Sequence, residues 1–312
     1  MPLRNIRIKV FRGAQNLPLY IAQKRRLFEK YGLYVELLFT KNSVELRDGL
    51  ANGEFEIAHT AADNAIAMKD VAGHDVTIFM GGDSGLNELF SQPSIKTIAS
   101  LKGGTIIVDA PNTAYALQAK KVLLDAGLEE SRDYSVVPVG ATYQRIEALK
   151  ENPSFSASVL NPPFSEEARQ AGFHSLGRII DLIGAYQATT AFAMRDWLEG
   201  NPDLVVKYVS AYIEAVRFVL DASNRETATS VLEHSLGLSL NVAGQTYSRL
   251  VEPGFGLDKD ACIDMDGLRN VLRLRSQLEG SADNDGLAAS RYVDVRYYRQ
   301  ALQQLTSAGT AD

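Results

Sequence analysis

The sequence is poor in the features that mark several classes of protein. Its 312 residues include one cysteine, Cys262, which excludes an internal disulfide and a zinc site built from cysteines. No apolar run reaches the ~18 residues of a membrane span, so membrane insertion is not expected. With a net charge of −6 and no clustered basic patch, nucleic acid is not an expected partner.

Signatures of cofactor and metal sites are also missing. No phosphate loop or dinucleotide fingerprint follows an expected strand, so no cofactor is expected. The acidic residues 283–286 resemble part of a calcium loop but lack its closing glutamate, which indicates a turn and no metal. The N-terminus is basic but has no apolar leader segment, so the sequence as given predicts a cytoplasmic protein. Removal of a leader would instead indicate a periplasmic one.

What the sequence does contain is a regular alternation of strands and helices. Strands are expected at 6–12, 34–40 and 55–60, with helices at 17–33, 43–54 and 61–73. The same order then repeats, with strands at 103–110, 133–140 and 155–160 and helices at 112–128, 142–153 and 161–172. Alternation of this kind is typical of parallel sheets covered by helices, so two α/β lobes are predicted.

Two extended segments connect these lobes. Residues 74–97 and 177–195 have no helical periodicity and are rich in β-branched and aromatic residues, which predicts strands that cross between the lobes at a hinge. From Asn201 the chain becomes helical, and this tail is expected to pack on the first lobe, with its last residues, 306–312, disordered. The predicted first lobe is therefore residues 1–95 and 190–312, and the second is residues 96–189.

The architecture predicts where a ligand binds. In open parallel sheets, ligands lie beyond the carboxyl ends of the strands, where helix N-termini present free N–H groups. Two lobes facing each other would direct such ends into one cleft. A cleft with many N–H donors and few fixed positive charges suits a small carboxylate, a sulfonate or a polar aromatic compound.

Four stretches carry a resemblance to a known family: LPLYIAQKRRLFEKYGLYVELLF, LANGEFEIAHTAADNAIA, LKGGTIIVDAPNTAYALQAKKVLLDAGL and NPDLVVKYVSAYIEAVRFV. Together they resemble the type II periplasmic-binding-protein fold, and within it the branch that binds nitrate, alkanesulfonates and thiamine-pyrimidine precursors for ABC transporters. The resemblance implies a two-lobed "Venus flytrap" with two crossover strands and a C-terminal helical segment. It further implies a small-molecule ligand, a monomer or dimer and, if the protein is exported, an ABC permease as partner.

The resemblance and the expected cleft also predict ligand-binding residues. Contacts carried over from the family fall on Gln15, Asn16, His59, Thr60, Asp109, Asn112, Thr113, Asn161, Tyr186 and Gln187. The helix N-termini expected at the cleft add Ser43, Asp63 and Thr142.

His59 keeps a second function open. Exported relatives usually carry a small residue at this position, whereas a histidine brings a group with a pKa near 6.5 into the expected cavity. The same fold also serves cytoplasmic enzymes. The alternative is therefore a cofactor-independent lyase, decarboxylase or isomerase that acts on a small carboxylate with His59 as general acid or base. The sequence does not decide between a binding protein and an enzyme.

Overall fold

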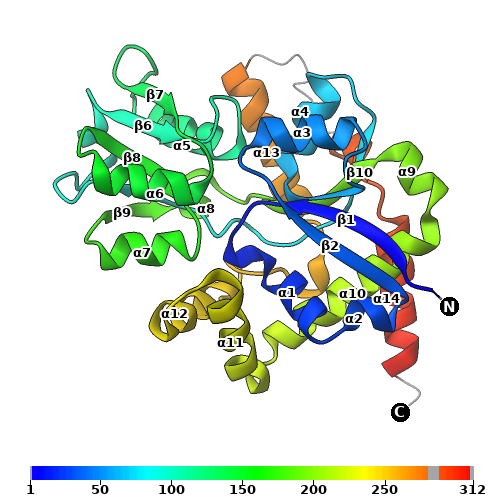
Figure 1. Ribbon diagram of the computed structural model, residues 1–312. Coiled ribbons are helices and arrows are strands. Elements are labelled where there is room, and N and C mark those ends of the chain that lie inside the picture. Colours follow the sequence, from blue (N-terminus) through cyan, green and yellow to red (C-terminus); the bar gives the residue numbers. More distant parts are fainter. Residues whose placement is uncertain (1, 280–287, 310–312) are drawn as a thin grey trace.

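The computed structural model describes residues 2–279 and 288–309, and it consists of two lobes that lie side by side (Figure 1). Each lobe is built on a five-stranded sheet with helices against it. The first sheet has the order β2 (Leu33–Phe39), β1 (Arg4–Val10), β3 (Ile57–Ala61), β10 (Thr189–Met194) and β4 (Val76–Met80). The second has the order β7 (Ser135–Pro138), β6 (Thr105–Val108), β8 (Phe155–Leu160), β5 (Glu88–Ser91) and β9 (His174–Arg178). The predicted two-lobed α/β fold is confirmed.

Each sheet combines parallel and antiparallel pairs. β1 is parallel to β2 and β3, and β6 is parallel to β7 and β8. β10 and β5 are antiparallel to their neighbours, because each is reached by a chain segment that crosses from the other lobe. The crossovers are residues 81–87 and 184–188. β5, residues 88–91, pairs with β8 and β9 of the second sheet, so the chain enters the second sheet before residue 95, the predicted end of the first lobe. The lobe boundaries at 95 and 190 remain a prediction.

Helices cover both sheets. In the N-terminal part of the first lobe, the helices are α1 (Leu17–Lys24), α2 (Leu27–Lys30), α3 (Ser43–Ala51) and α4 (Ala62–Asp70), and the short 3-10 helix η1 (Ala14–Asn16) precedes them. In the second lobe they are η2 (Ile98–Leu101), α5 (Ala114–Asp125), α6 (Thr142–Glu151), α7 (Phe164–Gln170) and α8 (Ile179–Ile183). The C-terminal part contains α9 (Arg195–Gly200), α10 (Pro202–Leu220), η3 (Ala222–Asn224), α11 (Arg225–Leu236), α12 (Leu240–Leu250), η4 (Lys259–Ala261), α13 (Met265–Glu279), η5 (Ala288–Tyr292) and α14 (Arg296–Gly309).

Three local predictions were wrong. The helix expected at 17–33 is divided into α1 and α2, because Arg26 adopts a left-handed conformation with φ of 58°. The second crossover segment contains the short helix α8 where only strand was expected. The final helix extends to Gly309, so residues 306–309 are helical rather than disordered. The acidic residues 283–286 lie outside the described residues.

The tail is anchored on the first lobe through α10. Its predicted apolar face, Leu204, Val205, Tyr208, Tyr212, Val216 and Val219, is buried in one core with α1 and with β1. This burial confirms the expected packing of α10. The tail also reaches the second lobe, since Arg249 of α12 donates to Glu166 of α7 at 3.2 Å and α13 packs against α5. The C-terminal helices therefore connect both lobes.

The described residues contain neither a membrane-spanning helix nor a cluster of metal ligands. None of the helices found there is long and apolar enough to cross a membrane. Across residues 2–279 and 288–309, no group of three or more histidine, cysteine, aspartate or glutamate side chains is arranged to hold a metal ion.

Candidate functional site

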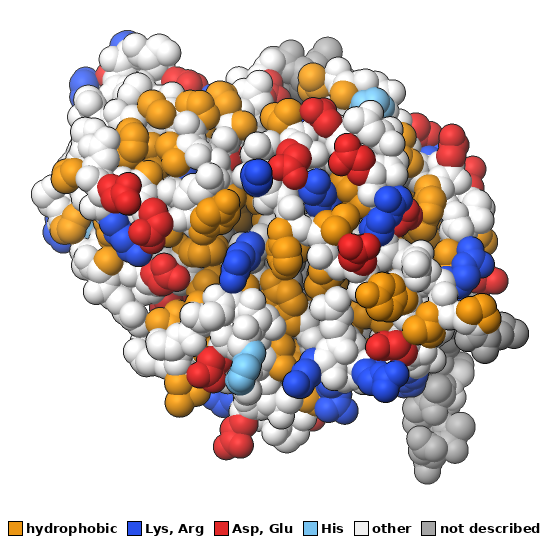
Figure 2. All heavy atoms as spheres, in the orientation of Figure 1, with side chains coloured by type: hydrophobic (Ala, Val, Ile, Leu, Met, Phe, Trp, Pro, Cys, Tyr) orange, Lys and Arg blue, Asp and Glu red, His pale blue; other side chains and the backbone are white. Residues whose placement is uncertain are grey.

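A cavity lies between the lobes, where the carboxyl ends of strands from both sheets meet. Its empty space is about 660 Å³, including the part open to solvent. Loops after β1 and β3 line it from the first lobe, loops after β6 and β8 line it from the second, and both crossovers contribute to its wall. Figure 2 shows hydrophobic side chains gathered along the boundary between the lobes, with lysine and arginine side chains beside them. The cavity lies where the sequence predicts the cleft.

The structure brings seven of the predicted site residues to the cavity wall. These are Gln15, Ser43, Thr60, Asp109, Thr113, Thr142 and Asn161. The other six do not line it: Asn16, His59, Asp63, Asn112, Tyr186 and Gln187. The predicted segments therefore reach the cavity, but about half of the predicted side chains point elsewhere. Whether any of the thirteen contacts a ligand stays a prediction.

His59 lies in the core of the first lobe and not in the cavity, which differs from the expectation. Its Nδ1 lies 2.8 Å from the Tyr208 hydroxyl, its ring packs 4.7 Å from the ring of Tyr212, and it is 2% exposed. Successive side chains of a strand point to opposite faces, so Thr60 faces the cavity and His59 faces α10. Burial lowers the pKa of His59 to about 3, so the imidazole is neutral at physiological pH.

Three of the other displaced residues, Asp63, Asn16 and Gln187, have structural partners. Asp63 forms a buried ion pair with Arg275 at 2.6 Å, and the Asn16 side chain donates to the Phe11 carbonyl at 2.6 Å. Gln187 accepts from the backbone of Asp264 at 2.6 Å. Tyr186 is buried at 1% exposure, and Asn112 lines a different cavity beside α3 and α4. At the end of the second crossover, Ala188 and the first residue of β10, Thr189, line the cavity instead, one and two residues beyond the expected pair.

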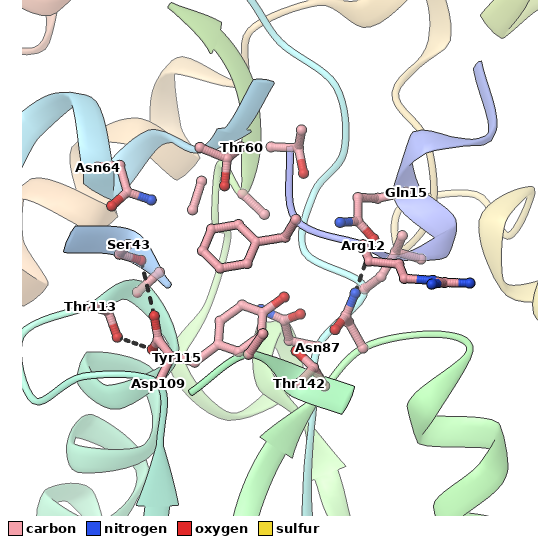
Figure 3. Close-up of a pocket in the computed structure, with 18 of the residues that line it drawn as sticks. Arg12, Gln15, Ser43, Thr60, Asn64, Asn87, Asp109, Thr113, Tyr115 and Thr142 are labelled. Carbon is pink, nitrogen blue, oxygen red and sulfur yellow. Dashed lines mark hydrogen bonds between the residues drawn. The ribbon is translucent and has the colours of Figure 1, made fainter. Parts of the chain in front are cut away.

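Direct hydrogen bonds across the cavity hold the lobes together. The Ser43 hydroxyl of α3 donates to Asp109 at 2.9 Å, and the Asn161 amide donates to Gln15 at 3.0 Å (Figure 3). The backbone N–H of Ala14 donates to the Pro162 carbonyl at 3.1 Å. Each bond joins a residue of the first lobe to a residue of the second. The structure is therefore a closed form, in which separation of the lobes breaks these contacts.

Two helix N-termini of the second lobe face the cavity. α5 begins at Ala114 and α6 at Thr142, and both residues line it. The Thr113 hydroxyl donates to Asp109 instead of capping α5, so the first N–H groups of α5 have no side-chain cap. Free N–H groups at a helix start favour an acceptor or an anionic group of a ligand.

Arg145, one turn into α6, is a cavity residue that the sequence analysis missed. It is 1% exposed, and its guanidinium donates to Thr142 and Ser158 at 2.9 Å and to two backbone carbonyls. It also lies over the Tyr115 ring, 5.0 Å from the centroid. Among the described residues no carboxylate forms an ion pair with it. Burial lowers the pKa of Arg145, while the nearby charge of Asp109 opposes this change.

Aromatic and polar side chains from other elements complete the wall. Phe11, Asn64, Asp83, Asn87 and Tyr115 line the cavity, and none of them was predicted. In Figure 3 the Tyr115 ring lies between Asp109 and Asn87. Burial raises the pKa of Tyr115, and the nearby Asp83 and Asp109 raise it further, so the phenol is neutral. Phe11, near the end of the first predicted strand, and Asp83, within the first predicted crossover, could have been found from their positions alone.

Asp83 is a buried carboxylate in the first crossover. Its Oδ1 accepts the Gly85 N–H at 2.9 Å, and the residue is 2% exposed. Burial raises the pKa of Asp83, and the Thr189 hydroxyl and nearby backbone N–H groups limit the rise. Together Asp83, Asp109 and Arg145 give the enclosed cavity two carboxylates and one guanidinium.

Two lobes, two crossovers and a cavity between them are the architecture of a two-lobed small-molecule-binding protein. The chain belongs to the NMT1-like family, whose family model matches residues 1–233. The family and fold predicted from the sequence are confirmed.

Known proteins of this fold are similar along most of the chain. The periplasmic nitrate-binding protein NrtA of Synechocystis PCC 6803 has a TM-score of 0.82 at 17% identity, covering 97% of this chain and 89% of its own. The alkanesulfonate-binding protein SsuA of Xanthomonas axonopodis pv. citri, bound to MOPS, has a TM-score of 0.73 at 14% identity, covering 96% and 98%. At these identities the likeness shows the fold.

A curated relative is the nitrate import ATP-binding protein NrtC of Synechococcus elongatus, which is 24% identical over 272 residues. The match covers 81% of this chain. The chain spans only 41% of the length of that relative, so the activity of the whole relative does not carry over by similarity alone.

Proposed function

We propose that this protein captures a small polar aromatic compound in the interlobe cavity and delivers it to an ABC permease. One observation carries the proposal: the cavity lies at the hinge side of two lobes that direct hydrogen bonds hold closed, which is the geometry of capture by closure. Membership of the NMT1-like family and the likeness to NrtA and SsuA support small-molecule binding.

The cavity wall favours an aromatic ligand among the three classes expected from the sequence. Phe11 and Tyr115 offer ring surfaces, and Thr60, Asn64 and Asn87 place polar groups around them. Aromatic faces combined with a few fixed polar groups are typical of sites for organic ligands. Nitrate and simple alkanesulfonates have no ring to use these faces.

A lyase or decarboxylase is not proposed. That alternative depended on His59 as acid or base, and the structure places this residue in the core against Tyr208 and Tyr212. A general base must lie within hydrogen-bond reach of the group that it deprotonates. With its pKa lowered to about 3, His59 is also a weak base.

Delivery to a permease implies a location outside the cytoplasm. The cytoplasmic location expected from the sequence has no support in the comparisons, whereas NrtA is described as periplasmic. Fractionation of cells that express the native gene tests this part of the proposal. Recovery of the protein in the cytoplasmic fraction alone would rule out its role in import.

Ligand binding is tested by a thermal-shift screen of carboxylates, sulfonates and polar aromatic compounds. A ligand at 100 times its Kd stabilises the folded state by ~2.7 kcal/mol, which raises Tm by several degrees. We expect Tyr115→Leu to weaken any aromatic hit by at least tenfold. The matched control is Tyr143→Leu, because Tyr143 is 39% exposed and does not line the cavity. Hits confined to non-aromatic anions would refute the proposed ligand class.

A further inference from the structure

Three buried acceptors of the cavity wall have no hydrogen-bond partner. They are Oδ2 of Asp83, Oδ1 of Asn64 and Oδ1 of Asn161, and no donor reaches them among the described residues. Each residue lines the cavity and is at most 4% exposed. A buried acceptor without a donor is unfavourable, so in a native protein it requires an explanation.

The orientation of Asn161 is fixed by its neighbour. Its Nδ2 donates to the Pro162 carbonyl at 3.4 Å and to Gln15 Oε1 at 3.0 Å, so its Oδ1 is the end left to accept. In its ionised form, the Asp83 carboxylate has only acceptor atoms. Burial raises the pKa of Asp83, and a cationic donor at Oδ2 would favour the ionised form. At two of the three positions, therefore, the missing partner is a donor.

Folding of the crossover explains only one side of Asp83. Its Oδ1 accepts the Gly85 N–H at 2.9 Å, and its backbone carbonyl accepts from Gln187 Nε2 and from the Ala188 N–H. These bonds shape the turn at residues 83–85. The Thr189 hydroxyl and the backbone N–H groups of Leu86 and Thr189 also act on the carboxyl, but none of them reaches Oδ2 in hydrogen-bond geometry.

The charges of the cavity agree with a missing donor. Asp109 already accepts from the Ser43 and Thr113 hydroxyls, whereas Asp83 retains a free oxygen. The buried cation is Arg145, and four of its five N–H groups are directed to Gly140, Thr142, Ser158 and Val159. Arg12 also lines the cavity but is exposed. The enclosed part therefore has two carboxyl groups and one buried cation, and that cation is directed away from Asp83 by its own hydrogen bonds.

We infer that the ligand is an aromatic compound with a protonated amine or an amidine, and that Asp83 accepts a hydrogen bond from an N–H group of it. This inference rests on the proposed function. Asn64 and Asn161 accept further N–H groups, and the rings of Phe11 and Tyr115 contact its apolar part. This class differs from nitrate and sulfonates, which offer no donor to Asp83. A cationic group of the ligand near the rings of Phe11 and Tyr115 would also gain cation–π attraction.

The test uses four probes that share one ring and differ in charge: benzamidine, benzylamine, benzoate and benzenesulfonate. Their binding to the full chain is measured by calorimetry and by thermal shift at pH 7. The variants are Asp83→Asn, which keeps the shape and the acceptor for Gly85, and Asp258→Asn as matched control. Asp258 is a second carboxyl of this region, bonded to the Ser84 hydroxyl at 2.7 Å, and does not line the cavity.

We expect a cationic probe to bind the parent, to bind Asp83→Asn at least tenfold more weakly, and to bind Asp258→Asn within twofold of the parent. If circular dichroism shows that Asp83→Asn does not fold, Asn64→Leu takes its place in the test. We then expect the cationic probe to bind Asn64→Leu at least threefold more weakly than the parent. Binding of benzoate or benzenesulfonate alone would overturn the inference and leave the proposed aromatic ligand intact. Equal losses in both aspartate variants would also overturn it. No binding by any of the four would refute both proposals.

Discussion

Replacing His59 should change how the stability of the protein depends on pH. The imidazole is enclosed by Tyr208 and Tyr212, its Nε2 has no partner among the described residues, and burial lowers its pKa from about 6.5 to about 3. The unfolded chain therefore binds a proton at this position below about pH 6.5, and the folded chain does not until about pH 3. Stability is lost as the pH falls through this window.

The size of the effect follows from the shift. Each pH unit inside the window lowers the free energy of unfolding by ~1.4 kcal/mol, which amounts to ~2 kcal/mol between about pH 7.5 and about pH 5. Asp258 acts in the opposite direction, because burial raises its pKa to about 7. Its contribution to stability is present at low pH and is lost as the pH rises through 7, so the total curve of the parent is flattened.

Comparing the pH dependence of stability in a His59 variant with that of the parent separates the contribution of His59 from that of groups such as Asp258. His59→Gln removes the titration and keeps an amide that can bond to the Tyr208 hydroxyl, and His234→Gln serves as control because His234 is exposed. Urea unfolding followed by circular dichroism gives the free energy of unfolding at both pH values. We expect the loss between pH 7.5 and pH 5 to be ~2 kcal/mol smaller in His59→Gln than in the parent and in the control. Equal losses in the parent and in His59→Gln would show that His59 is protonated in the folded protein.

Three further changes test other parts of the structure. The pair of Arg249 with Glu166, whose carboxylate is 5% exposed, joins α12 to the second lobe, so a double-mutant cycle of Arg249→Met and Glu166→Gln should give a coupling of ~1–2 kcal/mol in urea unfolding. Asp258→Asn should stabilise the protein at pH 8 by at least ~1 kcal/mol, measured in the same way, because no buried carboxyl need ionise and the Ser84 bond can remain. Arg145→Met should destabilise the fold by ~2–4 kcal/mol in thermal melting, since it leaves buried carbonyls without donors; a change below ~0.5 kcal/mol would contradict the buried network.

The fold could be predicted because its signal is repeated along the chain. The alternation of strands and helices, the glycines that end the helices and the apolar face of α10 all predict the same two-lobed arrangement. An error in the bounds of one element does not alter that arrangement. The break at Arg26 was missed because the apolar spacing continues across it. A single left-handed residue leaves no mark in the periodicity.

The site was predicted less well because it depends on the direction of single side chains. The segment around residues 57–63 was correctly expected at the cavity, but only strand register decides that Thr60 and not His59 faces it. Arg145 was missed for another reason. A charged residue in an amphipathic helix is usually exposed, and here the helix start lies under the cavity, so the charge is buried against Ser158.

In the closed form the polar groups of the cavity have two roles. The Ser43 hydroxyl bonds to Asp109 and the Asn161 amide nitrogen bonds to Gln15, so these donors stabilise closure. Oδ2 of Asp83, Oδ1 of Asn64 and Oδ1 of Asn161 remain acceptors that no closure bond uses. A ligand that donates to them adds stability to the closed form without competing for the contacts that close it. Affinity and closure can then increase together, which is what a capture protein requires.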